Sequence, residues 1–388
     1  MSYTTLKAIE KELNQQIKER PDAIRCGLVA VVAQVPFIQA GPPGVAKTLL
    51  MRSFAQRVLG ARYFEMDMTE STTPEKLMGP LNVPKYVNEG VYEQVLTNGL
   101  GNAELAMIDE FFNGNQVVLH EAMPVILERR YKMGDGTMLA VPLLSAFMGT
   151  NKIITDDPEL APVWDRIPLR VVVDYIQDPM VRRAMALESL ARRASHGDRA
   201  NAHTPGMDFT TVTLDELKQA NKEALALDLS DRAIEVHMEL GEELRSQGVI
   251  ISDRRFAESW PLVQANAWLN GHDQVEVTDL DILVHSWWTD YENKAKVFST
   301  ITEAVNPLLR EILQLTEYLR VLKSEMEQVK DNDPTEVRKA IHAQSQILNE
   351  KVALLQAMGD DSRAQRLIAE YQSYTDELKT ILSKSFGL

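Results

Sequence analysis

The stretch GPPGVAKT, residues 41–48, matches the pattern of a phosphate-binding loop except at one position. Such a loop turns successive backbone N–H groups around phosphate oxygens, and its glycines stand where the chain passes close to the anion or takes positive φ. Gly41 and Gly44 are kept, but Ala46 stands where the pattern has glycine. We expect the following helix to begin there, so that alanine takes a helical φ at little cost. The residues expected to contact the nucleotide are Gly41, Pro42, Pro43, Gly44, Val45, Ala46, Lys47, Thr48 and Leu49.

The segments on either side of the loop support a nucleotide site. Residues 37–40 before it are suited to a buried strand, and Leu50, Phe54 and Val58 after it recur at helical spacing. In this setting Lys47 would reach the terminal phosphates of ATP and the Thr48 hydroxyl would help to hold Mg²⁺. The alternative is a glycine-proline turn between two unrelated elements.

Residues 1–192 alternate short apolar segments with helical ones, which is typical of a parallel α/β sheet covered by helices. Turn-forming residues also predict two inserted hairpins, at residues 83–96 and 131–141. The five predicted strands cover residues 37–40, 63–66, 105–108, 145–149 and 170–173.

The rest of the chain is predicted to be helical. A turn-rich linker at residues 195–206 leads into a lid domain at 207–300, with helices expected at 214–227, 230–247, 253–270 and 278–288. Residues 301–388 are expected to form a helical hairpin or three-helix bundle, because apolar residues recur at alternating spacings of three and four. The first of these three helices carries Leu308, Ile312, Leu315, Leu319, Leu322, Met326 and Val329, and the third carries Leu367, Tyr371, Tyr374, Leu378 and Ile381.

Polar residues follow two of the predicted strands. In LAMIDE, residues 105–110, Asp109 is suited to hold Mg²⁺ and Glu110 to orient an attacking water. In MGTN, residues 148–151, Asn151 comes at the carboxyl end of a strand, where parallel sheets bind ligands. It could hydrogen-bond the γ-phosphate or the water, or simply cap a helix.

Two arginines are candidates for contacts to the phosphates. Arg166, in WDRI at residues 164–167, is a candidate finger that enters the site of a neighbouring subunit, since guanidinium offers a fixed charge and a bidentate fork. A surface pair between Asp165 and Arg166 is the alternative, and Arg170 is a weaker candidate for the finger. Arg254, in SDRR, could lean over the nucleotide and report its γ-phosphate to the lid.

Composition limits the function further. The formal net charge of −15 disfavours binding to nucleic acid, which depends on neutralising phosphates with Lys and Arg. No run is apolar enough to predict a membrane span, and the single cysteine, Cys26, excludes an intrachain disulfide. We therefore expect a cytoplasmic protein without stable membrane insertion.

Taken together, these motifs resemble those of the MoxR group of AAA+ ATPases, and within it the RavA branch. The resemblance covers roughly residues 5–295 and rests on GPPGVAKT, LAMIDE, MGTN, WDRI and SDRR, with Ala46 matching that branch. It implies an ATP- and Mg²⁺-dependent hexameric ring whose sites are each completed by the next subunit. It also implies chaperone-like remodelling of a protein client together with a protein bearing a von Willebrand A domain. The tail departs from RavA because it lacks a β-rich module, which leaves the partner open.

Two other functions fit parts of the sequence. A nucleotide-controlled oligomeric signalling scaffold with slow hydrolysis would use the same loop, although it would not need Glu110. A nucleic-acid translocase is disfavoured by the net charge.

Overall fold

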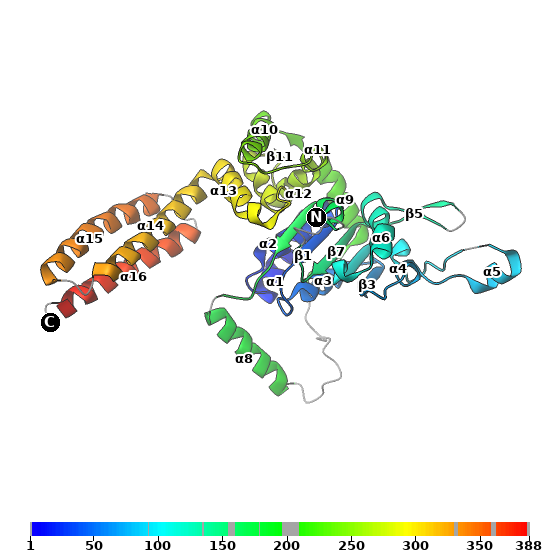
Figure 1. The fold of residues 1–388 in the computed structure, drawn as a ribbon, viewed down its shortest axis with the longest axis horizontal. Helices are drawn as coiled ribbons and strands as arrows, with labels where there is room; N and C mark the ends of the chain where they lie inside the picture. The colour runs from blue at the N-terminus through cyan, green and yellow to red at the C-terminus, as the bar shows by residue number, and fades with distance from the viewer. Residues whose placement is uncertain are drawn as a thin grey trace. The chain divides into compact units, whose positions relative to one another are not determined.

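The computed structural model describes residues 2–91, 93–133, 136–153, 160–177, 179–195, 209–329, 333–357 and 362–385. The chain forms two compact units, Met1–Ile301 and Thr302–Leu388. The sheet, the nucleotide-binding motifs and the segment predicted as a lid all belong to the first unit (Figure 1). A boundary between core and lid near residues 192–207 stays a prediction.

A five-stranded parallel sheet organises the first unit, in the order β3-β4-β7-β1-β8. Its central strands β1 and β7 are buried along their whole length, as expected for a sheet covered by helices. All five predicted strands are confirmed, and none of their bounds differs by more than one residue. The strands are β1 (Phe37–Ala40), β3 (Tyr63–Asp67), β4 (Leu105–Asp109), β7 (Ser145–Thr150) and β8 (Leu169–Val172).

Helices that precede and follow the loop of residues 41–48 pack on this sheet. Helix α2 (Pro21–Val32), buried on nearly every side, contacts β1, β7 and β8, and α3 (Lys47–Ala55) contacts β4 and β7. Helix α6 (Gln116–Glu128) leads into β5. Four short elements and one longer helix complete this part of the chain: α4 (Pro74–Met78), η1 (Leu100–Asn102), η2 (Phe111–Asn113), α7 (Ala161–Asp165) and the longer α8 (Pro179–Ser195).

The prediction of a hairpin at residues 83–96 was wrong. Residues Val83–Glu89 form helix α5, joined to the rest of the insertion by one antiparallel bridge between Leu81 and Gln94. The Asn82 side chain caps the helix by accepting from the Lys85 N–H at 3.3 Å, and Gly90, at φ 68°, ends it. The residues that predicted a hairpin turn, Asn88-Glu89-Gly90, instead end a helix, because glycine suits both positions equally well.

The second predicted hairpin is confirmed. Strands β5 (Arg130–Lys132) and β6 (Met138–Ala140) pair in antiparallel register, with Tyr131 opposite Leu139. The first two residues of its turn, 134 and 135, lie outside the described residues.

The lid segment is helical with two differences from prediction. The helix expected at residues 253–270 is two helices, α11 (Asp253–Ala257) and α12 (Trp260–Asn270), because Pro261 has no N–H and would clash with the carbonyl four residues before it. The last predicted helix is the 3₁₀ helix η3 (Val277–His285). The predicted linker lies almost wholly outside the described residues. Further elements are β2 (Val58–Leu59), β9 (Val212–Thr213), α9 (Leu214–Leu225), β10 (Asp228–Leu229), α10 (Asp231–Ser246), β11 (Gln274–Val275), η4 (Tyr291–Asn293) and α13 (Lys294–Val305).

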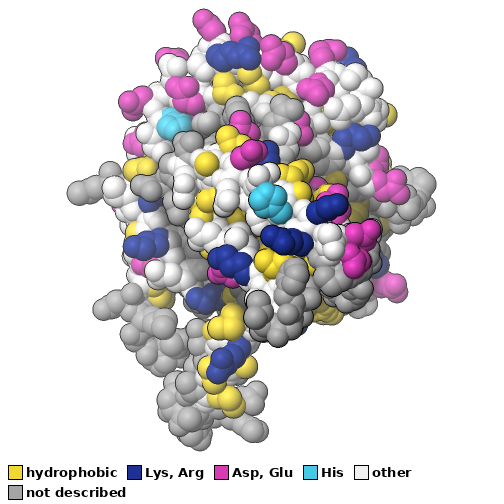
Figure 2. All heavy atoms as spheres, turned by 90° about the vertical axis from the view of Figure 1, so that its left-hand side faces the viewer, with side chains coloured by type: hydrophobic (Ala, Val, Ile, Leu, Met, Phe, Trp, Pro, Cys, Tyr) yellow, Lys and Arg dark blue, Asp and Glu magenta, His cyan; other side chains and the backbone are white. Residues whose placement is uncertain are grey.

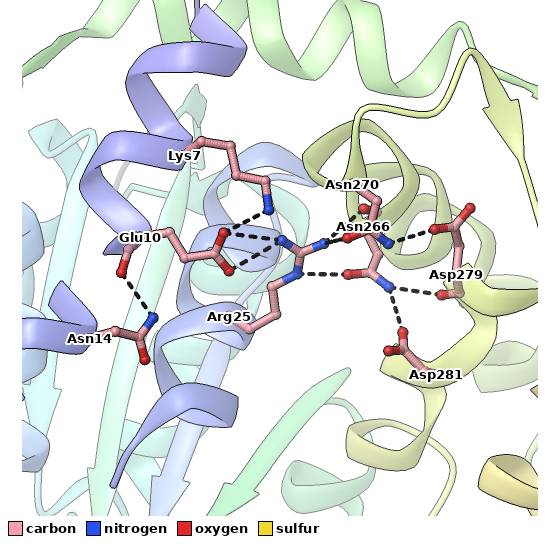
Figure 3. Close-up of polar contacts among 8 residues, drawn as sticks. All are labelled: Lys7, Glu10, Asn14, Arg25, Asn266, Asn270, Asp279 and Asp281. Atoms are coloured by element: carbon pink, nitrogen blue, oxygen red, sulfur yellow. Dashed lines mark hydrogen bonds and ion pairs between the residues drawn. The ribbon is translucent and has the colours of Figure 1, made fainter. Parts of the chain in front are cut away.

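Figure 3 shows how the N-terminal helices are joined to the lid. Arg25 of α2 lies between Glu10 of α1 (Ser2–Gln16) and two asparagines of α12. Its Nε donates to Asn266 Oδ1 at 2.8 Å, and its Nη1 lies 3.2 Å from a carboxylate oxygen of Glu10. Asn270 accepts a further bond from the same guanidinium. Arg25 thus connects α2 to both α1 and α12.

The second unit is a bundle of three helices. The predicted apolar residues between Ile312 and Met326 of the first helix are buried together with those between Leu367 and Leu378 of the third, and Ile381 is partly buried. The side chains of Leu308 and Val329, also predicted here, lie outside the described part of the structure. Tyr371 donates its hydroxyl hydrogen to the Leu315 carbonyl at 2.6 Å. Among the described helices of the whole chain, none is both long and apolar enough to cross a membrane. The three helices are α14 (Pro307–Val329), α15 (Pro334–Ala357) and α16 (Ser362–Ser385).

Candidate active site

The loop of residues 41–48 joins β1 to α3, and its backbone differs from expectation at Ala46. Helix α3 begins at Lys47, and Ala46 precedes it in the left-handed region, at φ 69° and ψ 22°. The prediction of a helical φ was therefore wrong, because closing the loop requires a left-handed turn at that residue. For a residue with a Cβ this conformation costs about 1–2 kcal/mol. The loop holds this strain at the position where its pattern has glycine.

Gly41 is needed for a different reason from the one expected. Its φ is not positive, but a Cβ at this position would lie 2.1 Å from the Val173 carbonyl oxygen, just after β8. Gly44 has φ 83° and open space around it. The first glycine thus allows close packing against the neighbouring strand, and the second allows the turn.

The Lys47 side chain lies within the loop. Its Nζ donates to the carbonyls of Gly41 at 2.7 Å and Pro42 at 3.1 Å, and to Asn151 Oδ1 at 2.7 Å. Burial lowers the pKa of Lys47, while Asp109 and Glu110 raise it in part. The ammonium group therefore occupies the place where a loop of this kind receives terminal phosphates.

Thr48 and Asp109 meet as the sequence predicts. The Thr48 hydroxyl donates to Asp109 Oδ2 at 2.7 Å. Gly149 makes room for this carboxylate, since a Cβ there would lie 2.2 Å from Asp109 Oδ1. A hydroxyl and one carboxylate fit Mg²⁺, which takes few protein ligands and completes its shell with phosphate oxygens and waters. The described residues contain no cluster of three or more His, Cys, Asp or Glu arranged to bind a metal.

Glu110 is held by two amides. Its carboxylate accepts from Asn151 Nδ2 and, at 3.0 Å, from Asn113 Nδ2. Asn113 ends the 3₁₀ turn η2 directly after Glu110, and the sequence analysis missed it. Its signal in the sequence is weak, namely an asparagine three residues after the acid. Lys47, Thr48, Asp109, Glu110 and Asn151 are called the phosphate-side group below.

Arg20 is a second residue that the sequence analysis missed. It is buried just before α2, and its Nε donates to the Val45 carbonyl at 3.2 Å while its Nη2 bonds the Asp174 carbonyl. The guanidinium thus ties the loop backbone to the segment after β8. All of these acceptors are backbone carbonyls far away in sequence, so no motif marks this arginine.

The two candidate arginines, Arg166 and Arg254, lie together elsewhere. Both are exposed, and the Arg254 Nε lies 3.1 Å from both carboxylate oxygens of Glu258. The bonds of the phosphate-side group described above include neither arginine, and a role of Arg254 at the nucleotide stays a prediction. We call the cleft that they line the arginine cleft; its residues are Asp165, Arg166, Pro168, Ser252, Arg254, Arg255, Glu258 and Ser286.

The structure also decides between the alternatives for the residues beside Arg166. Asp165 pairs with Arg255, which is buried, and this pairing was not foreseen. Arg170 is entirely buried within β8, between the rings of Trp164 and Trp288, and so cannot serve as a finger.

Two family models match the chain. The model described as the MoxR domain in the MoxR-vWA-beta-propeller ternary systems matches residues 4–219, which is more than half of the chain. A model of an AAA lid domain matches residues 228–301.

Individual proteins agree with these matches. Two uncharacterised proteins of Methanocaldococcus jannaschii are 30% and 32% identical to the chain, over 84% of it, and the alignments cover 80% and 82% of those relatives. A crystal structure of a Cytophaga hutchinsonii protein, described as a candidate ATPase, matches with a TM-score of 0.60 and 18% identity, covering 79% of this chain and 95% of that one. At 18% identity this structural similarity is evidence for the fold alone. From its motifs, its sheet and lid, and the model that matches residues 4–219, the chain belongs to the MoxR family of AAA+ ATPases.

Proposed function

We propose that this chain hydrolyses ATP in a Mg²⁺-dependent reaction at sites formed between copies of itself, and uses the energy to remodel a protein client. The observation that carries the proposal is the separation of two half-sites. The phosphate-side group contains a lysine, two acids and the Asn151 amide, whereas the two exposed arginines lie in the arginine cleft. A second copy of the chain can bring the two halves together.

Within the phosphate-side group each residue has a role that follows from its contacts. Lys47 would exchange its carbonyl partners for the β- and γ-phosphates, and Thr48 and Asp109 would hold Mg²⁺, whose charge offsets that of the phosphate oxygens. Glu110 would orient the attacking water, and the amides of Asn113 and Asn151 hold its carboxylate in place.

Arg166 and Arg254 would act on the nucleotide of the neighbouring subunit. Since they line one cleft of the same chain, a single docking event would deliver both guanidinium groups. Arg254 would then sense the neighbour's γ-phosphate rather than its own. A ring, hexameric as the family resemblance implies, lets every subunit give one half-site and receive another.

The family match supports a proposal about partners. Because the matching family model describes a ternary system, we propose a von Willebrand A domain protein, and with it a β-propeller protein, as partners in the cytoplasm. Nucleic acid remains a poor partner for a chain of net charge −15, and on the face in Figure 2 acidic side chains are interspersed with basic ones. The specific likeness to the RavA branch stays a prediction.

Phosphate release by the full chain tests the proposal. We expect turnover with ATP and Mg²⁺, loss of both turnover and nucleotide binding in Lys47→Ala, and no change in Lys11→Ala, which alters an exposed lysine. Native mass spectrometry should show an oligomer in the presence of nucleotide. A wild-type protein that stays monomeric and releases no phosphate would contradict the proposal.

The alternative of a slow signalling scaffold makes the opposite prediction for the C-terminal unit. If that unit organises the assembly, removal of residues 303–388 should abolish oligomerisation. In an ATPase assembled through its two half-sites, the shortened chain keeps both its oligomer and its turnover. The two amides that hold Glu110 favour the ATPase, because a slow switch has no need of a positioned water-orienting acid.

A further inference from the structure

The helix that precedes Arg166 is too short to be stable without bonds to its surroundings. Helix α7 has five residues, Ala161–Asp165, and Arg166 follows as its C-terminal cap. A helix this short is unstable alone. Its last carbonyls accept few backbone bonds: Val163 accepts from the Arg166 N–H and Trp164 from the Ile167 N–H, each at 3.2 Å. Side chains that bind the end of this helix therefore help to fix the position of Arg166.

Two buried arginines bind the last carbonyls of α7. Arg170 of β8 donates through Nη1 to the Trp164 carbonyl at 3.2 Å, and Arg255 of α11 donates through Nη2 to the Asp165 carbonyl at 2.7 Å. The Arg255 Nη2 also bonds the Asp165 carboxylate, and its Nη1 donates to the Thr289 hydroxyl at 2.7 Å. Arg170 belongs to the sheet and Arg255 belongs to the lid, so the end of α7 is bound from both parts.

Burying the charged guanidinium groups of Arg170 and Arg255 costs free energy. The Arg255 side chain is 4% exposed and Arg170 is fully buried, and burial lowers the pKa of each guanidinium. Asp165 supplies a single carboxylate that is 34% exposed. Replacing buried ions with apolar groups often leaves stability unchanged or increases it, so this pairing is weak as a device for stability alone. It does fix the end of α7 through several directed bonds.

We propose that Arg255 is a positioning residue, through which the lid holds Arg166 in place to complete the site of the neighbouring subunit. The inference rests on the proposed function, because it needs Arg166 to act in the neighbour's site. It means that a movement of the lid in one subunit changes catalysis in the next one. Arg254, the neighbour of Arg255 in sequence, moves with the same helix and lines the same cleft.

Turnover and nucleotide binding of single variants form the first test. Arg255→Gln should lower turnover on the order of 100-fold, as expected when a catalytic group is displaced by about 1 Å. Its affinity for ATP should stay unchanged, because the loop of its own chain is intact. Arg255→Lys should recover part of the turnover, since lysine can still bond the Asp165 carbonyl. Arg245→Gln, at an exposed arginine of α10, is the matched control and should behave as wild type.

Mixed oligomers locate the defect on one side of the interface. Subunits with Arg255→Gln keep an intact phosphate-side group, and subunits with Glu110→Gln keep an intact arginine cleft. Mixing the two should restore turnover, because some interfaces then combine two intact halves. Mixing Arg255→Gln with Arg166→Ala should restore nothing, because both defects lie on the same half.

The other outcomes overturn the inference. If Arg255 serves only to fold the chain, the Arg255→Gln subunit is misfolded and its phosphate-side group does not work. Mixing it with Glu110→Gln or with Arg166→Ala then restores no turnover. If it acts on its own nucleotide, mixing with Arg166→Ala restores turnover instead. Failure of the proposed function is distinguishable, because it would appear first as absence of turnover in the wild-type protein.

Discussion

The phosphate-side group and the arginine cleft are built in opposite ways. In the first, the side chains bond one another: Lys47 donates to Asn151, Asn151 to Glu110, and Thr48 to Asp109. In the second, Arg166 and Arg254 are exposed, and Arg254 pairs with Glu258. One region is a network of side chains bonded to one another, and the other presents cations at a surface. The difference suggests that each chain contains two halves of two different sites.

The supports of the two regions also differ. The phosphate-side group stands at the ends of β1, β4 and β7, whose strands are held on both sides by neighbours in the sheet. The arginine cleft rests on a five-residue helix and on the lid. We expect the first region to be rigid and the second to depend on lid position. The predictions below test this contrast, beginning with the largest expected effect.

Arg166→Ala should break the pairing of the two halves most severely. An arginine finger contributes about 10³–10⁵ to kcat, so steady-state phosphate release should fall by that order while ATP binding remains. Activity should return in part when this variant is mixed with Glu110→Gln. The matched control is Arg232→Ala, at an exposed arginine of α10. Unchanged turnover in Arg166→Ala would remove the arginine cleft from the active site.

Glu110→Gln should disable the other half with a somewhat smaller effect. Loss of a water-orienting carboxylate costs about 10²–10⁴ in rate, while Lys47 and Thr48 still bind nucleotide. Single-turnover measurements should show a slow chemical step with ATP trapped on the protein. Glu121→Gln, at an exposed position of α6, should have no effect. Wild-type rates in Glu110→Gln would assign the water to another residue.

Acid should weaken the lid that supports the arginine cleft. His237 is buried against Phe256 and Trp287, at ring distances of 4.5 and 4.8 Å, and burial lowers its pKa to about 4. The unfolded chain binds a proton at this histidine near pH 6.5, whereas the folded chain does so only near pH 4. The free energy of unfolding should therefore fall by up to about 3 kcal/mol as the pH drops from 6.5 to 4.

Urea unfolding followed by tryptophan fluorescence checks this pH dependence. All five tryptophans belong to the first unit, so the signal reports on that unit alone. His237→Gln should flatten the pH profile between 6.5 and 4, whereas His342→Gln, at an exposed position of α15, should not. Equal slopes in wild type and His237→Gln would show that this histidine does not control acid stability.

The smallest expected effect concerns the strained residue of the loop. Ala46→Gly removes the left-handed strain but increases the entropy of the unfolded chain, so the free energy of unfolding should rise by about 0.5–1 kcal/mol. Ala46→Val should lower it, because a β-branched residue fits positive φ poorly. Denaturant midpoints of the two variants measure the difference. A less stable Ala46→Gly protein would mean that the alanine methyl group makes favourable contacts that outweigh the strain.

Most of the sheet could be predicted from the sequence, because each strand is a short apolar run between polar segments. The same holds for the phosphate-side group, since all five of its residues lie in the loop or at a strand end and parallel strands bring these ends together. Helix α5 was misread because Asn88-Glu89-Gly90 suits a hairpin turn and a helix stop alike. The φ of Ala46 could not be read locally, because it is set by how the whole loop closes.

The residues that the sequence did not reveal act across long separations. Arg255 bonds a residue 90 positions away, and Arg20 bonds the carbonyl of Asp174, 154 positions away. Their partners are mostly backbone carbonyls, which every residue type offers. A sequence pattern cannot mark such contacts, because nothing about the acceptor's side chain is required.

Helix α2 connects the nucleotide loop to the lid. Arg20, immediately before the helix, holds the Val45 carbonyl, while Arg25, one turn into it, holds Asn266 of α12. A shortened protein that begins at β1 would retain every motif of the nucleotide site. It would lack both of these attachments and would expose apolar surface on α9 and α12, which pack against α2. The first helix pair therefore belongs in any truncated version intended for nucleotide-binding experiments.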